Sequence, residues 1–255
     1  MRRDAFLVHA TSVVIFIGSN LAFLSRPTGF SPVGLAGLAP RFGLFPLPDS
    51  ERITAPISLA QLYLHPVNLV LWSLLAALWL MLLLDLIGQW QDPSESQRIA
   101  DRPAPPVALP FSSALILGAI WPWLIQPSPW LAATIAAAAA ALAFAATQSG
   151  RDQARPALDF AAGWALVTCG AILCHAVAIT LDMSASRANI LGILIATGAG
   201  MSAQIHMGRR LALSVAVVWG FCAIAATTMG FDPITAIAAI LGITAMTAVL
   251  IRAAS

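Results

Sequence analysis

The chain has 255 residues, of which 59% are apolar and only 9% are charged. Soluble domains carry about 25% charged residues, so this composition indicates a protein that is solvated by lipid. The formal net charge of +2 is too small to indicate a nucleic acid as a partner. The sequence contains no lysine, which excludes a retinal Schiff base and any other lysine-imine chemistry.

Eight apolar runs follow one another along the chain, and each is long enough to cross about 30 Å of hydrocarbon. Because a run in lipid must satisfy its own backbone hydrogen bonds, each is predicted to be a helix. The sequence therefore predicts an all-α, polytopic membrane bundle of about eight transmembrane helices, with one integral membrane domain over residues 1–255. The predicted helices occupy residues 5–25, 60–89, 107–126, 130–148, 157–182, 188–207, 211–229 and 234–251.

The first run, in MRRDAFLVHATSVVIFIGSNLAFLS, has features of an export signal. No small-x-small cleavage site follows it, and its about 20 apolar residues suffice to span a bilayer, so we expect a retained first helix. Two connections are long. Residues 26–58, rich in glycine and proline, are expected to form an outer loop, and residues 91–106 (QDPSESQRIADRPAPP) a polar inner linker.

The arginines are distributed unevenly between alternate connections. Cytoplasmic segments of inner-membrane proteins carry an excess of arginine. This rule predicts a multi-pass protein of the cell inner membrane with both termini in the cytoplasm. The inner segments then carry Arg2, Arg3, Arg98, Arg102, Arg151, Arg155, Arg209, Arg210 and Arg252, and the outer segments carry Arg26, Arg41, Arg52 and Arg187.

Small residues recur along the sixth predicted helix. Gly192, Ala196 and Gly200 stand at positions i, i+4 and i+8, so they share one helix face. Small residues at this spacing let helix backbones approach closely. We therefore expect this face to pack against another helix.

Two pairs of histidines share a membrane depth in the predicted topology. His65 and His175 both fall in the outer leaflet, about two turns from the surface at 1.5 Å per residue, and His9 and His206 both fall near the cytoplasmic face. Two imidazoles at one depth can hold a haem iron, and a single imidazole can ligate a chlorophyll magnesium. The alternative is that these histidines are interfacial or hydrogen-bonded.

Tryptophan and proline crowd into GAIWPWLIQPSPWLAA, residues 118–133. Trp121, Trp123 and Trp130 stand there among three prolines, and Trp72 and Trp164 also lie towards predicted helix ends. An aromatic belt at the membrane surface explains such positions. The same flat, apolar rings also make a wall for a planar ligand, and the sequence leaves both interpretations open.

The residue types required for hydrolysis or group transfer do not recur in a catalytic pattern. Asp85, Asp159 and Asp182 all stand near predicted helix ends, where we expect structural roles. The sequence also lacks a glycine-rich phosphate loop and a His-Glu-x-x-His metal motif. We therefore predict that the protein is not an enzyme.

Several short stretches carry a family resemblance. They are VVIFIGSNLAF, a loop that ends in ERITAPIS, NLVLWSLLAALWL, FAAGWALVTCGAI and SVAVVWGFCAIAA. In this order they resemble the longer, multi-helix members of the tryptophan-rich sensory protein family, also called the translocator protein or peripheral benzodiazepine receptor family. The chain departs from the family in lacking its Phe-x-x-x-Trp sequence after the Ile-Thr-Pro turn.

The resemblance implies non-catalytic binding or sensing of a flat apolar molecule such as a tetrapyrrole or sterol. The implied pocket residues are Trp72, Trp121, Trp123, Trp130 and Trp164, with His175 orienting the ligand. One alternative is a porphyrin, haem or chlorophyll held by His65 and His175 in an electron-transfer or light-harvesting complex. Another is an accessory subunit that packs against a larger membrane complex or forms a homodimer. Membrane lipid is a partner in every case.

Overall fold

A computed structural model describes residues 2–26, 58–91, 108–149, 155–208 and 210–254, and all regular secondary structure in these ranges is helical. The helices are α1 (Arg2–Leu24), α2 (Leu59–Leu64), α3 (Leu69–Gln91), α5 (Ala108–Leu124), α6 (Pro129–Ser149), α7 (Pro156–Leu181), α8 (Ala185–Met207), α9 (Ala212–Thr228) and α10 (Pro233–Ala254). The predicted inner linker lies outside the described residues except for Gln91, and so does the predicted outer loop except for its two end residues.

Six of these helices are long and apolar enough to cross a membrane, judged by length and composition. They are α1, α3, α6, α7, α8 and α10, whereas α5 and α9 are shorter apolar helices. The prediction of a helical membrane bundle is therefore confirmed. The described helices that meet the length criterion number six, against the eight that were predicted.

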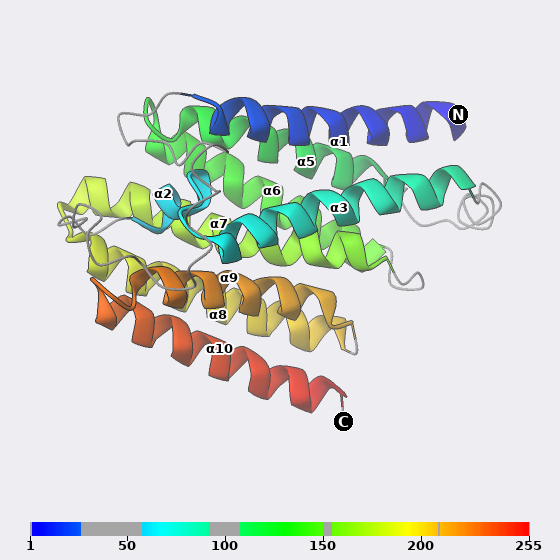
Figure 1. The fold of residues 1–255 in the computed structure, drawn as a ribbon. Helices are drawn as coiled ribbons and strands as arrows, with labels where there is room; N and C mark the ends of the chain where they lie inside the picture. Colours follow the sequence, from blue (N-terminus) through cyan, green and yellow to red (C-terminus); the bar gives the residue numbers. More distant parts are fainter. Residues whose placement is uncertain (1, 27–57, 92–107, 150–154, 209, 255) are drawn as a thin grey trace.

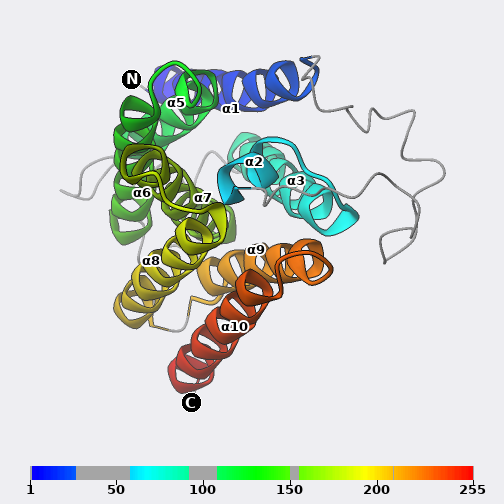
Figure 2. The same ribbon diagram turned by 90° about the vertical axis from the view of Figure 1, so that its left-hand side faces the viewer.

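The bundle is built around α7 (Figures 1 and 2). Helices α1, α5, α6 and α7 pack in sequence, and α7 then packs against α8 and α9, which both contact α10. Helix α3 lies in the hollow of this curved arrangement, against α7, α9 and α1. Both chain termini lie at one end of the bundle, which we call the terminal end, and α2 lies towards the opposite end, the far end (Figure 1).

The predicted helix over 60–89 is wrong, because the chain breaks between α2 and α3. Pro66 has no N–H to continue α2, and His65 before it adopts φ −131° and ψ 83°, outside the helical region. Asn68 then begins α3, since its Oδ1 accepts a hydrogen bond of 2.8 Å from the backbone N–H of Leu71. The break divides the apolar run into a helix of six residues and one of 23 residues.

Small residues bring helix backbones into direct contact. A Cβ atom on Gly170 of α7 would lie 2.9 Å from the carbonyl oxygen of Gly192 on α8. Ala196, one turn further along α8, also packs against Gly170. On the same face, a Cβ atom on Gly200 would lie 3.1 Å from Sδ of Met246 on α10. The predicted small-residue interface on α8 is thus confirmed.

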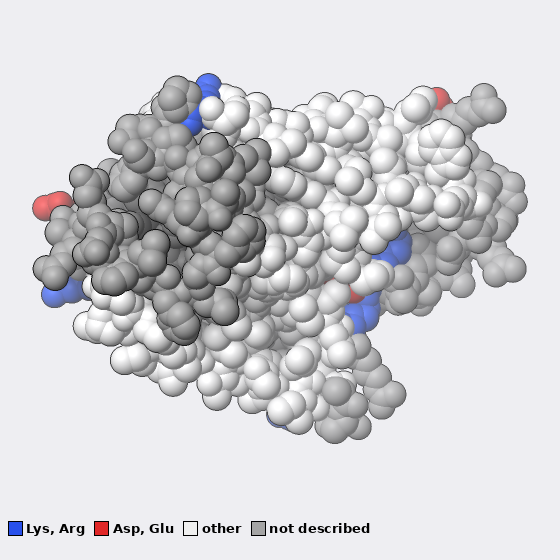
Figure 3. Space-filling model, viewed as in Figure 1, with Lys and Arg blue, Asp and Glu red and all other residues white. Residues whose placement is uncertain are grey.

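Apolar side chains cover much of the described surface. Helix α3 buries Leu71, Leu74, Leu78 and Leu82 on one face, while other leucines on the same helix are exposed. Along α1, charged atoms lie only towards its two ends, and the middle is uncharged (Figure 3). An apolar surface with charges at its margins suits a lipid environment.

Candidate functional site

A hollow of about 330 Å³ lies between α2, α7 and α8 towards the far end of the bundle. We call it the far-end pocket. Cys174, Ala188 and Asn189 are buried in its wall, whereas Gln61 and Asp182 are exposed. Its lining comprises Ser58, Leu59, Gln61, Ala171, Cys174, His175, Ala178, Ile179, Asp182, Met183, Ala185, Ala188 and Asn189.

One face of α7 supplies most of the chemistry of this pocket. Ala171, His175, Ala178 and Asp182 recur every three or four residues, so their side chains lie along one line of the helix. Within the described residues, the side chains of His175 and Asp182 make no hydrogen bond or ion pair. The pocket wall therefore presents an imidazole and a carboxylate whose hydrogen-bonding groups are available to a ligand.

Helix α2 closes the pocket on one side and is held there by its ends. The hydroxyl of Ser58 caps the helix by accepting a bond of 3.3 Å from the backbone N–H of Gln61. The backbone N–H of Leu59 donates to Oδ1 of Asn189 on α8 at 3.0 Å. At its other end, the Tyr63 hydroxyl donates to the carbonyl oxygen of Gly220 on α9 at 3.4 Å. These bonds fix a very short helix against two long ones.

Two of the tryptophans named from the sequence, Trp121 and Trp164, share a small buried cavity. It has a volume of about 20 Å³ and is lined by apolar residues that include Phe16 and Phe111. A cavity needs about 10–15 Å³ to hold one water molecule, so no planar ligand fits there. Trp164 packs edge-on against Phe16, with ring centroids 5.6 Å apart.

The other three tryptophans lie elsewhere and line neither hollow. Trp123 donates its Nε1–H to Oγ of Ser19 at 2.8 Å, and the Arg26 guanidinium lies 3.9 Å from its ring centroid. Trp130 is 51% exposed and donates to Oγ1 of Thr180 at 2.8 Å. Trp72 is half-buried on α3. The structure therefore does not bring the five tryptophans together in one pocket.

The histidines lie in four different surroundings. His65 stacks on Phe23 with ring centroids 5.5 Å apart and does not line the far-end pocket, whereas His175 does. His9 is buried beside Asp85, and His206 is exposed, with Nδ1 2.7 Å from the carbonyl oxygen of Ser202. The described residues contain no group of three or more His, Cys, Asp or Glu that suits a metal ion. The pocket beside His175 thus offers no second imidazole for a haem iron.

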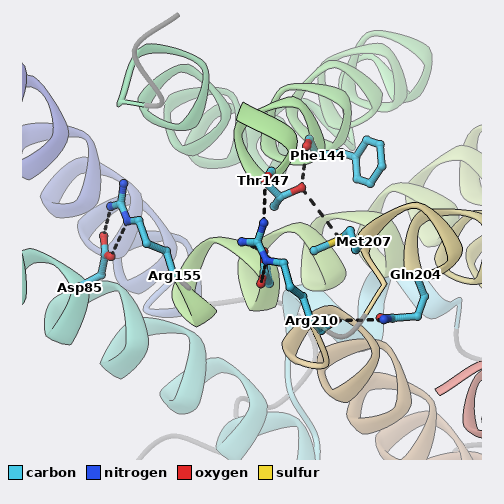
Figure 4. Close-up of polar contacts among 8 residues, drawn as sticks. Asp85, Phe144, Thr147, Arg155, Gln204, Met207 and Arg210 are labelled. Atoms are coloured by element: carbon cyan, nitrogen blue, oxygen red, sulfur yellow. Dashed lines mark hydrogen bonds and ion pairs between the residues drawn. The ribbon is translucent and has the colours of Figure 1, made fainter. Parts of the chain in front are cut away.

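A partly buried ion pair joins α3 to the start of α7 at the terminal end (Figure 4). Arg155 donates from Nε and Nη2 to the two carboxylate oxygens of Asp85, at 3.0 and 2.6 Å. Gln89 donates to the same carboxylate at 2.8 Å, and Nε2 of His9 on α1 lies 3.3 Å from it. Bidentate arginine–carboxylate pairs are strong and directional, so these contacts tie three helices together.

A second ion pair lies on the other side of the α7 N-terminus. Arg210 donates to both carboxylate oxygens of Asp159 at 2.9 and 2.6 Å, and its Nη1 donates to the carbonyl oxygen of Thr147 at 2.8 Å. Figure 4 shows Arg210 between Thr147 of α6 and Gln204 of α8, whose Nε2 donates to the Arg210 carbonyl oxygen at 3.0 Å. Asp85 and Asp159, for which structural roles were predicted, are therefore each held in an ion pair between helices.

No family model, curated protein or solved structure matches the chain.

Of the ligand-binding residues predicted from the sequence, His175 alone lines the far-end pocket, and its other described lining residues were not predicted. A usable signal was present, because His175 and Asp182 are seven residues apart and therefore lie on the same face of a helix. No local sequence pattern indicates that Ser58 and Gln61 line this pocket, because α2 and α7 are far apart in the sequence. Only the packing of α2 against α7 brings these residues to the pocket.

Proposed function

We propose that this chain binds a small amphipathic molecule in the far-end pocket without chemically converting it. The observation that carries the proposal is the 330 Å³ hollow in which His175 and Asp182 have no other partner among the described residues. Ligand pockets have volumes of about 300–1,000 Å³ and combine apolar walls with a few polar groups. The far-end pocket meets both conditions, at the small end of the range.

The proposal includes a topology of eight crossings in the cell inner membrane, with both termini in the cytoplasm. Two features support it. Both termini lie at the same end of the bundle, as an even number of crossings requires (Figure 1), and arginine is more frequent in the segments assigned to the inside. In this topology α5 and α9 cross the membrane as short helices, and the far-end pocket faces the outside. Reporter fusions at the two termini should both give a cytoplasmic signal.

The flat ligands implied by the family resemblance, tetrapyrroles and sterols, find no room between Trp121 and Trp164, where the cavity measures about 20 Å³. We therefore base the proposal on the pocket beside His175. A haem or chlorophyll held by His65 and His175 would colour the purified protein, and the colour would be lost in His175→Ala. We expect a colourless preparation.

Binding should be measured with purified full-length protein in lipid nanodiscs by isothermal titration calorimetry. The probes are 2-phenylethylamine, 2-phenylethanol and phenylacetate, which share one ring and nearly the same length. In Ala178→Trp, a large side chain fills the pocket. The variant should therefore bind none of the probes that bind the wild type. Ala138→Trp adds the same ring to an exposed position on α6 and serves as the control. The proposal fails if no probe binds the wild type or if binding survives in Ala178→Trp.

A further inference from the structure

Among the described lining residues, a single side chain gives the far-end pocket its formal charge. Asp182 is the only formally charged residue in the described lining. Two helix ends also meet there, the C-terminus of α7 and the N-terminus of α8. Their dipoles correspond to about −0.5 and +0.5 of a charge, so they largely cancel and leave the carboxylate dominant.

The arrangement of groups along α7 also has a direction. Asp182 lies at the exposed end of the pocket and adopts a left-handed C-cap conformation with φ 48°. His175 lies two turns deeper, about 10.5 Å along the helix axis at 1.5 Å per residue. Between them the wall is apolar, formed by Ala178 and Ile179. A ligand that follows this wall meets a carboxylate first, then an apolar stretch, then an imidazole.

We infer that the far-end pocket selects a small organic cation with an apolar body, such as a primary amine attached to a ring. This inference rests on the proposed function and names its ligand class. The ammonium group pairs with the Asp182 carboxylate at the rim, and the apolar body lies along Ala178. The inner end of the ligand reaches His175, whose ring nitrogens can donate or accept a hydrogen bond.

Charge complementarity with Asp182 favours an organic cation over an anionic or a neutral molecule of the same shape. A carboxylate ligand of the same shape would place two negative charges close together at the rim, where attraction and repulsion both strengthen as the surroundings become less polar. A neutral alcohol would keep the apolar contact and lose the ion pair. Arg187 is exposed on the neighbouring turn of α8 but does not line the pocket.

The same three probes test the inference at physiological salt. Because Asp182 is exposed and its ion pairs are partly screened, 2-phenylethylamine should bind the wild type about three- to fivefold more tightly than 2-phenylethanol. Phenylacetate should bind more weakly than the alcohol. Asp182→Asn should reduce amine affinity to that of the alcohol, and Asp182→Glu should keep the preference. Arg187→Gln, the control for general surface charge, should change amine affinity less than about twofold, because Arg187 does not line the pocket and the effect of an exposed charge falls with distance.

Retained binding of 2-phenylethanol by Asp182→Asn will demonstrate that the variant is folded and its pocket intact. Equal affinities of the wild type for all three probes, together with their loss in Ala178→Trp, would overturn the cation inference and leave the proposed function standing. A preference for the amine that persists in Asp182→Asn would also overturn it. Failure of every probe to bind the wild type would overturn both.

Discussion

The close approach of α7 and α8 at Gly170 allows a direct test of how these two helices pack. In Gly170→Ala, the new Cβ atom would lie 2.9 Å from the carbonyl oxygen of Gly192 and 3.2 Å from Cβ of Ala196. Real Cβ contacts are rarely closer than 3.4 Å, so the backbones must move apart by several tenths of an ångström. Neither contact atom can rotate away, because one is backbone and the other is the first atom of a side chain.

The size of the effect follows from two opposing terms. Replacing glycine by alanine in a helix interior gains up to about 1 kcal/mol in intrinsic helix stability. Overpacking a close interface costs about 1–3 kcal/mol. We therefore expect Gly170→Ala to lower the free energy of unfolding by up to about 2 kcal/mol. In Gly198→Ala, the exposed control on α8, a Cβ atom would meet nothing within 4 Å, so this variant should be neutral or slightly more stable.

The two variants can be compared by equilibrium unfolding in mixed detergent with increasing dodecyl sulfate, followed by tryptophan fluorescence. The two free energies of unfolding should differ by about 1–3 kcal/mol, with Gly198→Ala the more stable protein. If Gly170→Ala is as stable as Gly198→Ala, then α7 and α8 do not approach at these glycines and the described packing is wrong.

Two further substitutions test polar contacts by the same unfolding assay. Asp85→Asn should lower the free energy of unfolding by about 3 kcal/mol, because it leaves the Arg155 guanidinium without its charged partner. A double-mutant cycle with Arg155→Gln should recover much of this loss, and strict additivity would refute the pairing. Asn68→Ala should cost about 2 kcal/mol through loss of the α3 cap and of the 2.6 Å bond to Oγ1 of Thr227. Ser73→Ala, whose hydroxyl bonds only within α3 among the described residues, should change stability by less than about 0.5 kcal/mol.

The positions of the helices followed from the sequence because lipid leaves an apolar backbone few alternatives. Runs of sufficient length became helices, and the spacing of Gly192, Ala196 and Gly200 correctly indicated a packed face. The error at residues 60–89 came from Pro66, whose missing N–H and effect on the preceding residue are local signals. Hydrophobicity alone does not reveal the break at Pro66, since the residues on both sides of it are equally apolar.

The contacts between helices had no such local signal. Asp85 and Arg155 are 70 residues apart, and Asp159 and Arg210 are 51 apart, so only the packing of helices selects these partners. The tryptophans illustrate the same limit. Trp121 and Trp123 are only two residues apart at the end of α5, yet Trp121 lines a buried cavity and Trp123 donates a hydrogen bond to Ser19. Which direction each ring takes depends on the neighbouring helix and not on its own sequence.

Helix α7 connects the two polar regions of the molecule, since it begins beside Arg155 and ends beside Asp182. With 26 residues, it is about 39 Å long. Substitutions so far apart have independent effects when the element between them is rigid.

We therefore expect Asp85→Asn to leave the affinity of the far-end pocket for 2-phenylethylamine unchanged within about twofold, as measured by calorimetry in nanodiscs. A change of tenfold or more, about 1.4 kcal/mol, would mean that α7 has two arrangements and that the terminal-end ion pair favours one of them. The described contacts argue against this, because α7 packs against α6, α8 and α9 and its backbone lies directly against that of α8 at Gly170.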